Sequence, residues 1–351
     1  MAKGSNNTVR IGFIGTGGIG SYQISHLKKM ENVEVAAAAD PSQAALDRVQ
    51  REYQVGKVST DWREVVKMDD LDAISVCTPN KLHYEPTVAA LKAGKHVLCE
   101  KPLAMNAKEG REMIAAAKKH KKMLQIAFQW RFTSTAQMLR RANLSGKFGK
   151  VLYVRCQALR RRGIPNWGVF GQKELQGGGP MIDIGVHILE MAHYIIGSPK
   201  PISASGACFT YLGNKKSDTM CQWPGWDYKT YNVEDLAVGL VRFEDGSALV
   251  IESSFAAHIE KDEFNVQIMG TEGGGTYSPP MLFSDEAGYM MNMQPAYVGE
   301  TDGFAYKMKH FVDCIRGVCP CEAPGEDGLM VQTMLDGIYE SAQNRREVAI
   351  K

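Results

Sequence analysis

The stretch VRIGFIGTGGIG at residues 9–20 constrains the fold of this chain more than any other part of its sequence. An apolar run typical of a buried strand leads into Gly15, Gly17 and Gly20, spaced as G-x-G-x-x-G, and a stretch with helical character follows. In that context the first glycine permits a tight turn, the second lets the backbone approach a pyrophosphate, and the third lets helix and strand pack closely. These residues therefore predict the opening strand, turn and helix of a dinucleotide-binding unit.

An acidic residue supports that interpretation. The next predicted strand, VEVAAAAD, ends at Asp40, which lies 20 positions after Gly20. A carboxylate there can accept hydrogen bonds from the hydroxyls of an adenosine ribose, and it would repel a phosphate on the same ribose. The sequence therefore predicts NAD rather than NADP, and a turn without a ligand is the alternative.

Strands and helices continue to alternate up to about residue 128. LDAISVCTP, HVLCEKP and MLQIAF read as buried strands, and helical stretches separate them. This order predicts a parallel, doubly wound sheet, which binds its ligand at the carboxyl ends of the strands. Thr78, Asn80, Glu100 and Lys101 follow such strands, so we expect them to line one crevice with the glycine turn.

The pattern changes after about Phe132. VLYVRCQALR, PISASGACF, LAVGLVRFEDGSALVIESSFAA and FNVQIMGTEGG read as strands, and the tetrapeptide at 244–247 reads as a hairpin turn. A large, mainly antiparallel sheet follows. We expect two domains, 1–130 and 131–351, with the C-terminal helix packing at their boundary. A wide sheet with an uncovered face also predicts a homo-oligomer formed through the C-terminal sheet.

Composition narrows the class of protein. The 351 residues suffice for two domains, and 41 Lys plus Arg against 39 Asp plus Glu give a net charge of +2, with no preference for nucleic acid or membranes as partners. The start MAKGSNNTVR lacks the apolar core of a signal peptide, and no apolar run approaches the roughly 20 residues that span a bilayer. We therefore expect a cytoplasmic protein with a small-molecule substrate.

The eight cysteines are expected to be reduced thiols. Cys77 and Cys99 lie within apolar strands, where a thiol behaves as a small hydrophobic group. Cys314, Cys319 and Cys321 form a cluster, but no second pair at zinc-finger spacing accompanies them. The sequence therefore predicts no metal site, and we expect loop or core thiols there. His193 and His310 are expected to be structural histidines.

A second stretch with catalytic potential is GGGPMIDIGVHILEMAHYIIG. Pro180 stands where a helix would begin, and apolar residues occupy most faces of that helix, so it should be buried. Asp183 and His187 are four residues apart, so the carboxylate can hold one imidazole nitrogen and leave the other as a proton acceptor. A purely structural Asp–His pair is the alternative.

Taken together, the glycine turn, the Glu-Lys-Pro after a late parallel strand and the G-G-G-x-x-x-D-x-x-x-H helix resemble the Gfo/Idh/MocA family of oxidoreductases over essentially the whole chain. The resemblance implies an α/β fold with an N-terminal Rossmann domain and a C-terminal α+β domain. It implies Lys101 as the catalytic lysine, Asp183 as the substrate-binding acid and His187 as the catalytic histidine. The cofactor residues that the resemblance and the motifs predict are Gly15, Thr16, Gly17, Gly18, Ile19, Gly20, Asp40, Thr78, Asn80, His83, Glu100, Lys101 and Gln129.

The chemistry of alcohol oxidation suits these residues. Hydride passes to a nicotinamide while a base, His187, takes the hydroxyl proton, and a lysine ammonium stabilises the developing alkoxide. Pro102 fixes the backbone beside Lys101 and so holds its side chain in place. Weaker substrate-binding candidates, chosen because arginines suit hydroxyls and aromatic faces suit sugar rings, are Arg131, Arg160, Trp167 and Tyr194.

Three functions remain open at this stage. The first is an NAD-dependent dehydrogenase of a sugar, a cyclitol or a glycoside, including a glucoside oxidised at its third carbon. The second is a glycosidase that oxidises the sugar transiently with bound NAD, eliminates the aglycone and reduces the sugar again. The third is a protein that senses NAD without catalysis, which the presence of both Lys101 and His187 disfavours.

Overall fold

The computed structural model describes residues 8–350 and divides the chain into two compact units. Unit 1 combines the residues up to Gln129 with Asp302–Gly328, and unit 2 combines Trp130–Thr301 with the residues from Leu329 onward. The first break lies one residue from the predicted boundary. Residues 302–328, which fall within the range predicted for the second domain, belong to unit 1.

Unit 1 contains, within its described residues, a six-stranded parallel sheet with the order β3-β2-β1-β4-β5-β6. Its strands are β1 (Val9–Ile14), β2 (Val33–Ala39), β3 (Lys57–Ser59), β4 (Ala73–Val76), β5 (His96–Cys99) and β6 (Leu124–Ile126). All but β3 were predicted. That strand is three residues long and has no apolar run to reveal it.

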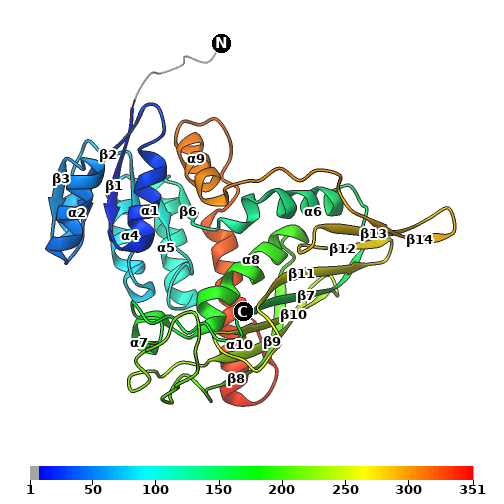
Figure 1. Cartoon of the computed structure of the whole chain (residues 1–351). Coiled ribbons are helices and arrows are strands. Elements are labelled where there is room, and N and C mark those ends of the chain that lie inside the picture. Colours follow the sequence, from blue (N-terminus) through cyan, green and yellow to red (C-terminus); the bar gives the residue numbers. More distant parts are fainter. Residues whose placement is uncertain (1–7, 351) are drawn as a thin grey trace, which may run out of the picture. The chain divides into compact units, whose positions relative to one another are not determined.

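Helices cover this sheet (Figure 1). They are α1 (Gly18–Leu27), α2 (Gln43–Tyr53), α3 (Trp62–Val66), the short 3₁₀ turn η1 (Asn80–Leu82), α4 (Tyr84–Lys92), α5 (Ala107–His120) and α9 (Gly303–Ile315). Helix α1 packs with α9, and α4 packs with α5. The return of the chain to unit 1 has a simple cause: Met308, Phe311 and Val312 on one face of α9 join the core formed by β1 and α1.

Unit 2 contains a nine-stranded mixed sheet among the described residues, in the order β14-β13-β12-β11-β7-β10-β9-β8-β15. Only β7 and β10 pair in parallel; the remaining neighbours are antiparallel. The strands are β7 (Val151–Leu159), β8 (Pro201–Phe209), β9 (Leu236–Phe243), β10 (Ala248–Ser254), β11 (Glu263–Gly270), β12 (Gly273–Thr276), β13 (Met281–Glu286), β14 (Tyr289–Met293) and β15 (Val348–Ala349). The predicted hairpin joins β9 to β10, and the predicted fold class is confirmed.

The other elements of unit 2 are η2 (Trp130–Phe132), α6 (Ser134–Leu144), α7 (Lys173–Gln176), the π-helical turn η3 (Met181–Gly185) and α8 (Val186–Ile195). Helix α10 (Gly325–Asn344) begins in unit 1 and continues in unit 2. In the part of the chain that the structure describes, no helix is both long and apolar enough to cross a bilayer.

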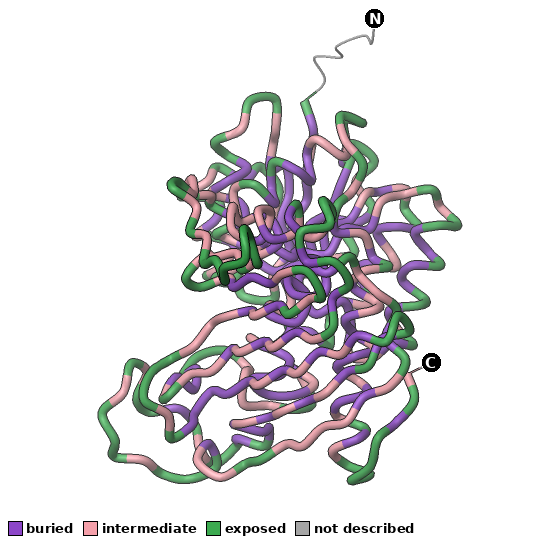
Figure 2. The backbone as a smooth tube through the Cα atoms, turned by 90° about the vertical axis from the view of Figure 1, so that its right-hand side faces the viewer, coloured by how far each residue is buried: buried purple, intermediate pink, exposed green. Residues whose placement is uncertain are grey.

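The strands of the large sheet alternate buried and half-exposed residues, as Figure 2 shows. Ala237, Gly239 and Val241 of β9 are on the buried side, where Ile338 of α10 packs closely against Gly239. Val238 and Leu240 alternate with them and remain half-exposed. This second side is the surface on which self-association was predicted, and self-association stays a prediction.

Candidate active site

The turn between β1 and α1 has the geometry that the glycine spacing predicted. Gly15 has φ +91°, and a Cβ there would lie 2.5 Å from the carbonyl oxygen of Cys77. A Cβ on Gly20 would lie 2.2 Å from the carbonyl oxygen of Gly15. At Gly17 and Gly18 a Cβ would meet no described atom within 4 Å. The turn is thus packed on its inner side and open at the start of α1, where backbone N–H groups favour phosphate.

Asp40 lies against this turn. Its Oδ2 accepts hydrogen bonds from the Thr16 N–H at 2.8 Å and the Thr16 hydroxyl at 3.2 Å, and its Oδ1 accepts from the Ser42 N–H at 2.9 Å. Arg48 donates to the carbonyl oxygen of Thr16 at 2.6 Å. The carboxylate therefore holds the glycine turn in shape, a role that the sequence did not predict. It stays half-exposed, so its oxygens remain accessible to further donors.

The loops after β4 and β5 are joined by His83. The ring is fully buried, with Nδ1 2.8 Å from the carbonyl oxygen of Pro102 and Nε2 3.0 Å from that of Thr78. Burial lowers the pKa of His83, and the two carbonyl contacts oppose that shift. The predicted cofactor ligand His83 therefore lies between the two loops, and its neutral ring, with a single N–H, can donate to one of these two carbonyl oxygens. Asn80, in the same loop, is also buried.

Glu100 sits in a buried polar network at the end of β5. Its Oε1 accepts hydrogen bonds from Gln23 at 2.6 Å and from Lys307 at 3.3 Å, and its Oε2 accepts from the Lys101 N–H at 3.2 Å. The side chain of Lys307 is 0% exposed and that of Glu100 is 8% exposed. Ser75 of β4 extends the network by donating to Gln23 at 2.7 Å.

Both oxygens of the Glu100 carboxylate therefore accept hydrogen bonds from the protein itself. The hydrogen bond from the Lys101 N–H also fixes the backbone next to Glu100. Lys101 is half-buried, and its peptide bond to Pro102 is cis. Gln129, the last predicted cofactor residue, is 7% exposed at the end of the first segment of unit 1. Lys307 was missed because it lies 207 positions from Glu100, and no local pattern links the two.

In unit 2 the glycine run is shaped by a buried acid. Glu234 accepts hydrogen bonds from the N–H groups of Gly179 at 2.9 Å and Met181 at 3.3 Å, and from the hydroxyl of Tyr339 at 2.6 Å. A Cβ on Gly178 would lie 2.1 Å from that hydroxyl. Burial raises the pKa of Glu234, and these donors oppose the shift. Glu234 thus caps the helix that carries Asp183.

The first turn of this helix is a π-helical turn, whereas the spacing predicted a regular α-helix. It spans Met181–Gly185 and contains Asp183, and the α-helix begins at Val186. The hydroxyl of Ser253 on β10 donates to the carbonyl oxygen of Pro180 at 2.9 Å and so links the start of this turn to the sheet. Single π turns of this kind recur at functional sites. Asp183 is 8% exposed, and His187 is half-buried.

One of the weaker substrate candidates, Arg160, lies near Asp183, and a second, Trp167, is connected to Arg160 through Trp223. Burial lowers the pKa of the Arg160 guanidinium, and the nearby Asp183 carboxylate opposes that shift. The same guanidinium lies over Trp223, 5.0 Å from the ring centroid, and Trp223 packs edge-on against Trp167 at 4.8 Å. Trp167 is 51% exposed. Trp223 completes this aromatic cluster and was missed, because its loop has no strand or helix pattern.

The other two weak candidates, Arg131 and Tyr194, contact neighbouring side chains within unit 2. Arg131 is 1% exposed and pairs with Glu190 at 2.5 Å, and its guanidinium lies 4.5 Å from the ring centroid of Tyr194. Arg140 lies over the same ring at 4.0 Å. The predicted substrate-binding role of Arg131 is not supported by this placement, because its charge is used inside unit 2.

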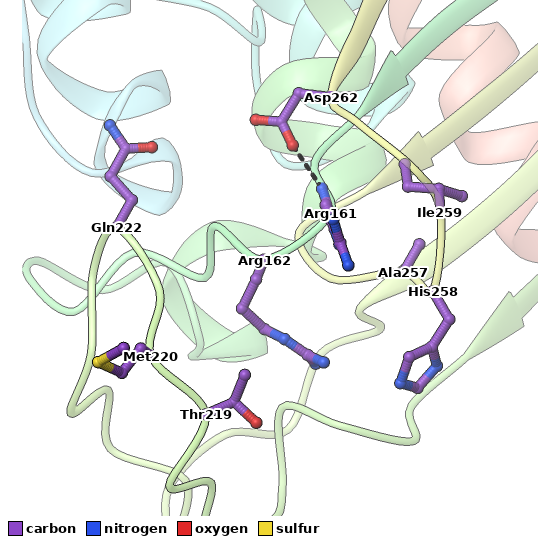
Figure 3. Close-up of a pocket in the computed structure, with 9 residues that line it drawn as sticks. All are labelled: Arg161, Arg162, Thr219, Met220, Gln222, Ala257, His258, Ile259 and Asp262. Atoms are coloured by element: carbon purple, nitrogen blue, oxygen red, sulfur yellow. Dashed lines mark hydrogen bonds between the residues drawn. The ribbon is translucent and has the colours of Figure 1, made fainter.

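A hollow of about 610 Å³ lies in unit 2, where the loop after β7 meets the loops at 219–222 and 257–262. Figure 3 shows the residues that line it. Arg162 points into it toward Thr219 and His258, and the Arg161 N–H donates to Asp262 at 2.7 Å. The candidate catalytic residues do not line this hollow. It is a separate surface feature beside the aromatic cluster.

A parallel sheet whose first turn opens toward a helix N-terminus, with an acid at the end of the second strand, belongs to the class of dinucleotide-dependent enzymes. Residues 9–128 match the family described as "Oxidoreductase family, NAD-binding Rossmann fold", and residues 141–350 match its C-terminal alpha/beta domain. The chain belongs to the Gfo/Idh/MocA family, as the resemblance indicated. It is an NAD-dependent oxidoreductase that acts on CH–OH groups.

Three known proteins show how close the likeness is. D-glucoside 3-dehydrogenase of Escherichia coli (strain K12) is 34% identical over 349 residues, which cover 99% of each chain. Myo-inositol 2-dehydrogenase of Thermotoga maritima is 26% identical over 98% of this chain and 99% of its own. A solved structure of levoglucosan dehydrogenase in complex with NADH shares the fold, with a TM-score of 0.84, 23% identity and coverage of 98% and 99%.

The buried pair yields a first prediction. Replacing Lys307 by Met should lower the free energy of unfolding by about 3–5 kcal/mol, because the Glu100 carboxylate would stay buried without its cation. Chemical denaturation of the NAD-free protein measures the difference. The control is Lys309→Met on the same helix, whose exposed amine pairs with Asp313 and should contribute about 0–1 kcal/mol. Equal effects of the two variants would show that the Glu100–Lys307 pair has no structural role.

Proposed function

We propose that this enzyme oxidises the C3 hydroxyl of a glucoside to a ketone, with NAD as hydride acceptor. The observation that supports this most is the combination, in unit 2, of Asp183 and Arg160 with the aromatic pair Trp223 and Trp167. A carboxylate and a guanidinium suit sugar hydroxyls, and aromatic faces suit the apolar face of a pyranose or an aglycone. The similarity to D-glucoside 3-dehydrogenase over 99% of both chains agrees with this choice of substrate.

In this proposal His187 and Lys101 act on the same hydroxyl group. His187 takes the hydroxyl proton as general base, a role worth about 10²–10⁴-fold in rate. The Lys101 ammonium donates a hydrogen bond to the oxygen as negative charge develops on it. NAD supplies the hydride acceptor. The alcohol thus loses a proton to the protein and a hydride to the cofactor, and leaves as a ketone.

Asp183 orients the sugar in this account. The Asp183 carboxylate is 8% exposed, so hydrogen bonds from sugar hydroxyls would replace those it has lost from water. The adjacent Arg160 balances its charge. The exposed Trp167 would contact the more distant part of the substrate, the aglycone. A glucoside with a flat or apolar aglycone should therefore bind more tightly than free glucose.

The function is tested by mixing the enzyme with NAD and a panel of methyl glucosides, levoglucosan and myo-inositol, and following NADH by absorbance. We expect NADH to form with the glucosides, and NMR of the product to show a ketone at C3. A matched 3-deoxy glucoside should give no NADH. Release of the aglycone without NADH would instead identify the transient-oxidation glycosidase, and activity confined to myo-inositol would identify a cyclitol dehydrogenase.

Lys101→Met should reduce kcat/KM by about 10²–10³-fold, because it removes a donor to the developing alkoxide. The dissociation constant for NAD, measured by calorimetry, should stay near that of the unmodified enzyme. Lys108→Met, an exposed lysine at the start of α5, serves as the control and should change neither quantity. Full turnover in Lys101→Met, or a loss confined to NAD affinity, would rule out the proposed contact with the reacting oxygen.

Asp40→Ser should weaken NAD about tenfold to a hundredfold, the range expected for lost hydrogen bonds to a charged group. NADP should be much less affected, because the removed carboxylate would have repelled its extra phosphate. The ratio of the two dissociation constants is the readout, since disturbance of the glycine turn through Thr16 would weaken both cofactors alike. A parallel loss for both would therefore exclude the ribose contact. Asp47→Ser on α2, an exposed acid, is the matched control.

A further inference from the structure

One histidine and three cysteines of unit 1 lie together where α9 ends. His310 and Cys314 stand one helical turn apart on α9, and Cys319 and Cys321 follow in the segment that leads to α10. Ligand atoms of His310, Cys314 and Cys321 all lie within 4.8 Å of one another. The sulfur of Cys319 is 3.7 Å from that of Cys314. The fold therefore places the cysteine cluster next to His310. The sequence revealed the cluster but did not link His310 to it.

The spacing of these atoms matches tetrahedral coordination. Zinc at about 2.3 Å from two thiolates holds the sulfurs roughly 3.8 Å apart, and a thiolate and an imidazole nitrogen roughly 3.5 Å apart. The Cys314 and Cys319 sulfurs are separated by 3.7 Å. The Cys314 sulfur is 3.3 Å from His310 Nε2, and the Cys319 sulfur is 3.6 Å from His310 Nδ1. The Cys314 sulfur and His310 Nε2 therefore already lie near the separation that one metal ion would impose. The Cys321 sulfur lies within 4.8 Å of the Cys314 sulfur and of a ring nitrogen of His310, and Cys319 lies on the Nδ1 side of the ring.

The protonation of His310 suits a metal ligand. The N–H of Glu322 donates to Nε2 at 2.9 Å, so in the neutral ring Nε2 carries the lone pair and Nδ1 carries the proton. The Nδ1–H faces the Cys319 sulfur, which can accept it. The Nε2 lone pair is thus used by the Glu322 N–H, and a metal bound at Nε2 would replace that hydrogen bond. The Nδ1–H would keep its acceptor, as in most metal-bound histidines.

A buried amide next to Cys321 provides an independent observation. Gln125 is 0% exposed, its Oε1 accepts a weak hydrogen bond from the Cys321 thiol at 3.7 Å, and its Nε2 has no hydrogen-bond partner among the described residues. A buried amide donor without a partner is costly. If Cys321 were a thiolate, rotation of the amide by 180° would let Nε2 donate to the sulfur. The surroundings of Cys321 therefore favour the thiolate that a metal requires.

We propose that His310, through Nε2, binds one zinc ion together with Cys314 and Cys321, and that Cys319 accepts the hydrogen bond of the His310 Nδ1–H. Thiolate and imidazole ligands in a tetrahedral arrangement select zinc among the common divalent cations. Binding exchanges the thiol protons for the metal and releases them to solvent, with no change of oxidation state. The ion would fasten the segment at 316–324 to the end of α9, while the neighbouring Ala323 and Pro324 pair with β6. The site is structural and independent of the proposed substrate.

The proposal is tested on tag-free, full-length protein that has been reduced and treated with a chelator. Titration with Co²⁺ should give one equivalent per chain, with sulfur-to-cobalt charge-transfer absorption and the intense visible bands of a tetrahedral complex, and Zn²⁺ should displace the cobalt. Cys314→Ser and Cys321→Ser should each weaken cobalt binding by at least about tenfold. Cys221→Ser, a partly buried thiol of unit 2, is the matched control and should bind as the unmodified chain does.

The spectrum of the unmodified protein decides the question even if a variant fails to fold. Absence of sulfur-to-cobalt charge transfer at stoichiometric Co²⁺ would overturn the proposal. So would unchanged binding in Cys321→Ser with the fold intact by circular dichroism, because the metal would then lie elsewhere. Failure of NADH production in the substrate panel would leave this result untouched, since the readout is metal binding and not turnover.

Discussion

The ion pair between Glu100 and Lys307 is the interaction on which the cofactor half of this enzyme depends. It joins the end of β5 to α9, and through Gln23 and Ser75 it also joins α1 and β4. Two charges removed from water are stable only when each is paired and hydrogen-bonded, so the network accepts essentially one arrangement. Lys101 directly follows Glu100 and donates its backbone N–H to the Glu100 carboxylate. The network therefore also fixes the backbone of the predicted catalytic lysine.

A buried acid performs the corresponding task in unit 2. Glu234 receives N–H groups from the start of the glycine-led helix and a hydroxyl from Tyr339, while Ser253 satisfies a carbonyl group at the same π turn. These contacts fix the position of the π turn that carries Asp183. Glu100 and Glu234 therefore hold in place the backbone that carries the predicted substrate-contacting residues, without needing to contact substrate themselves. Substituting either acid would impair catalysis by displacing those residues.

Local patterns were sufficient to predict the fold and the tight glycine turn of unit 1. Asp40 and the glycine turn could be predicted because strand, turn and helix follow one another within a few residues. Lys307 could not be predicted, since its partner is 207 positions away. The π turn at Asp183 could not be predicted either, because its residue types do not distinguish it from a regular α-helix. Arg131 is predicted to bind substrate because arginines suit hydroxyls, whereas in the structure its guanidinium pairs with Glu190 inside unit 2.

The most direct test of the account is a crystal structure of the enzyme with NADH and a glucoside, a complex that cannot react forward. We predict that a single hydroxyl oxygen, that of C3, lies within hydrogen-bond distance, about 3 Å, of both the Lys101 amine and a ring nitrogen of His187. A complex in which these two side chains contact different oxygens, or in which only one of them reaches the sugar, would contradict the account.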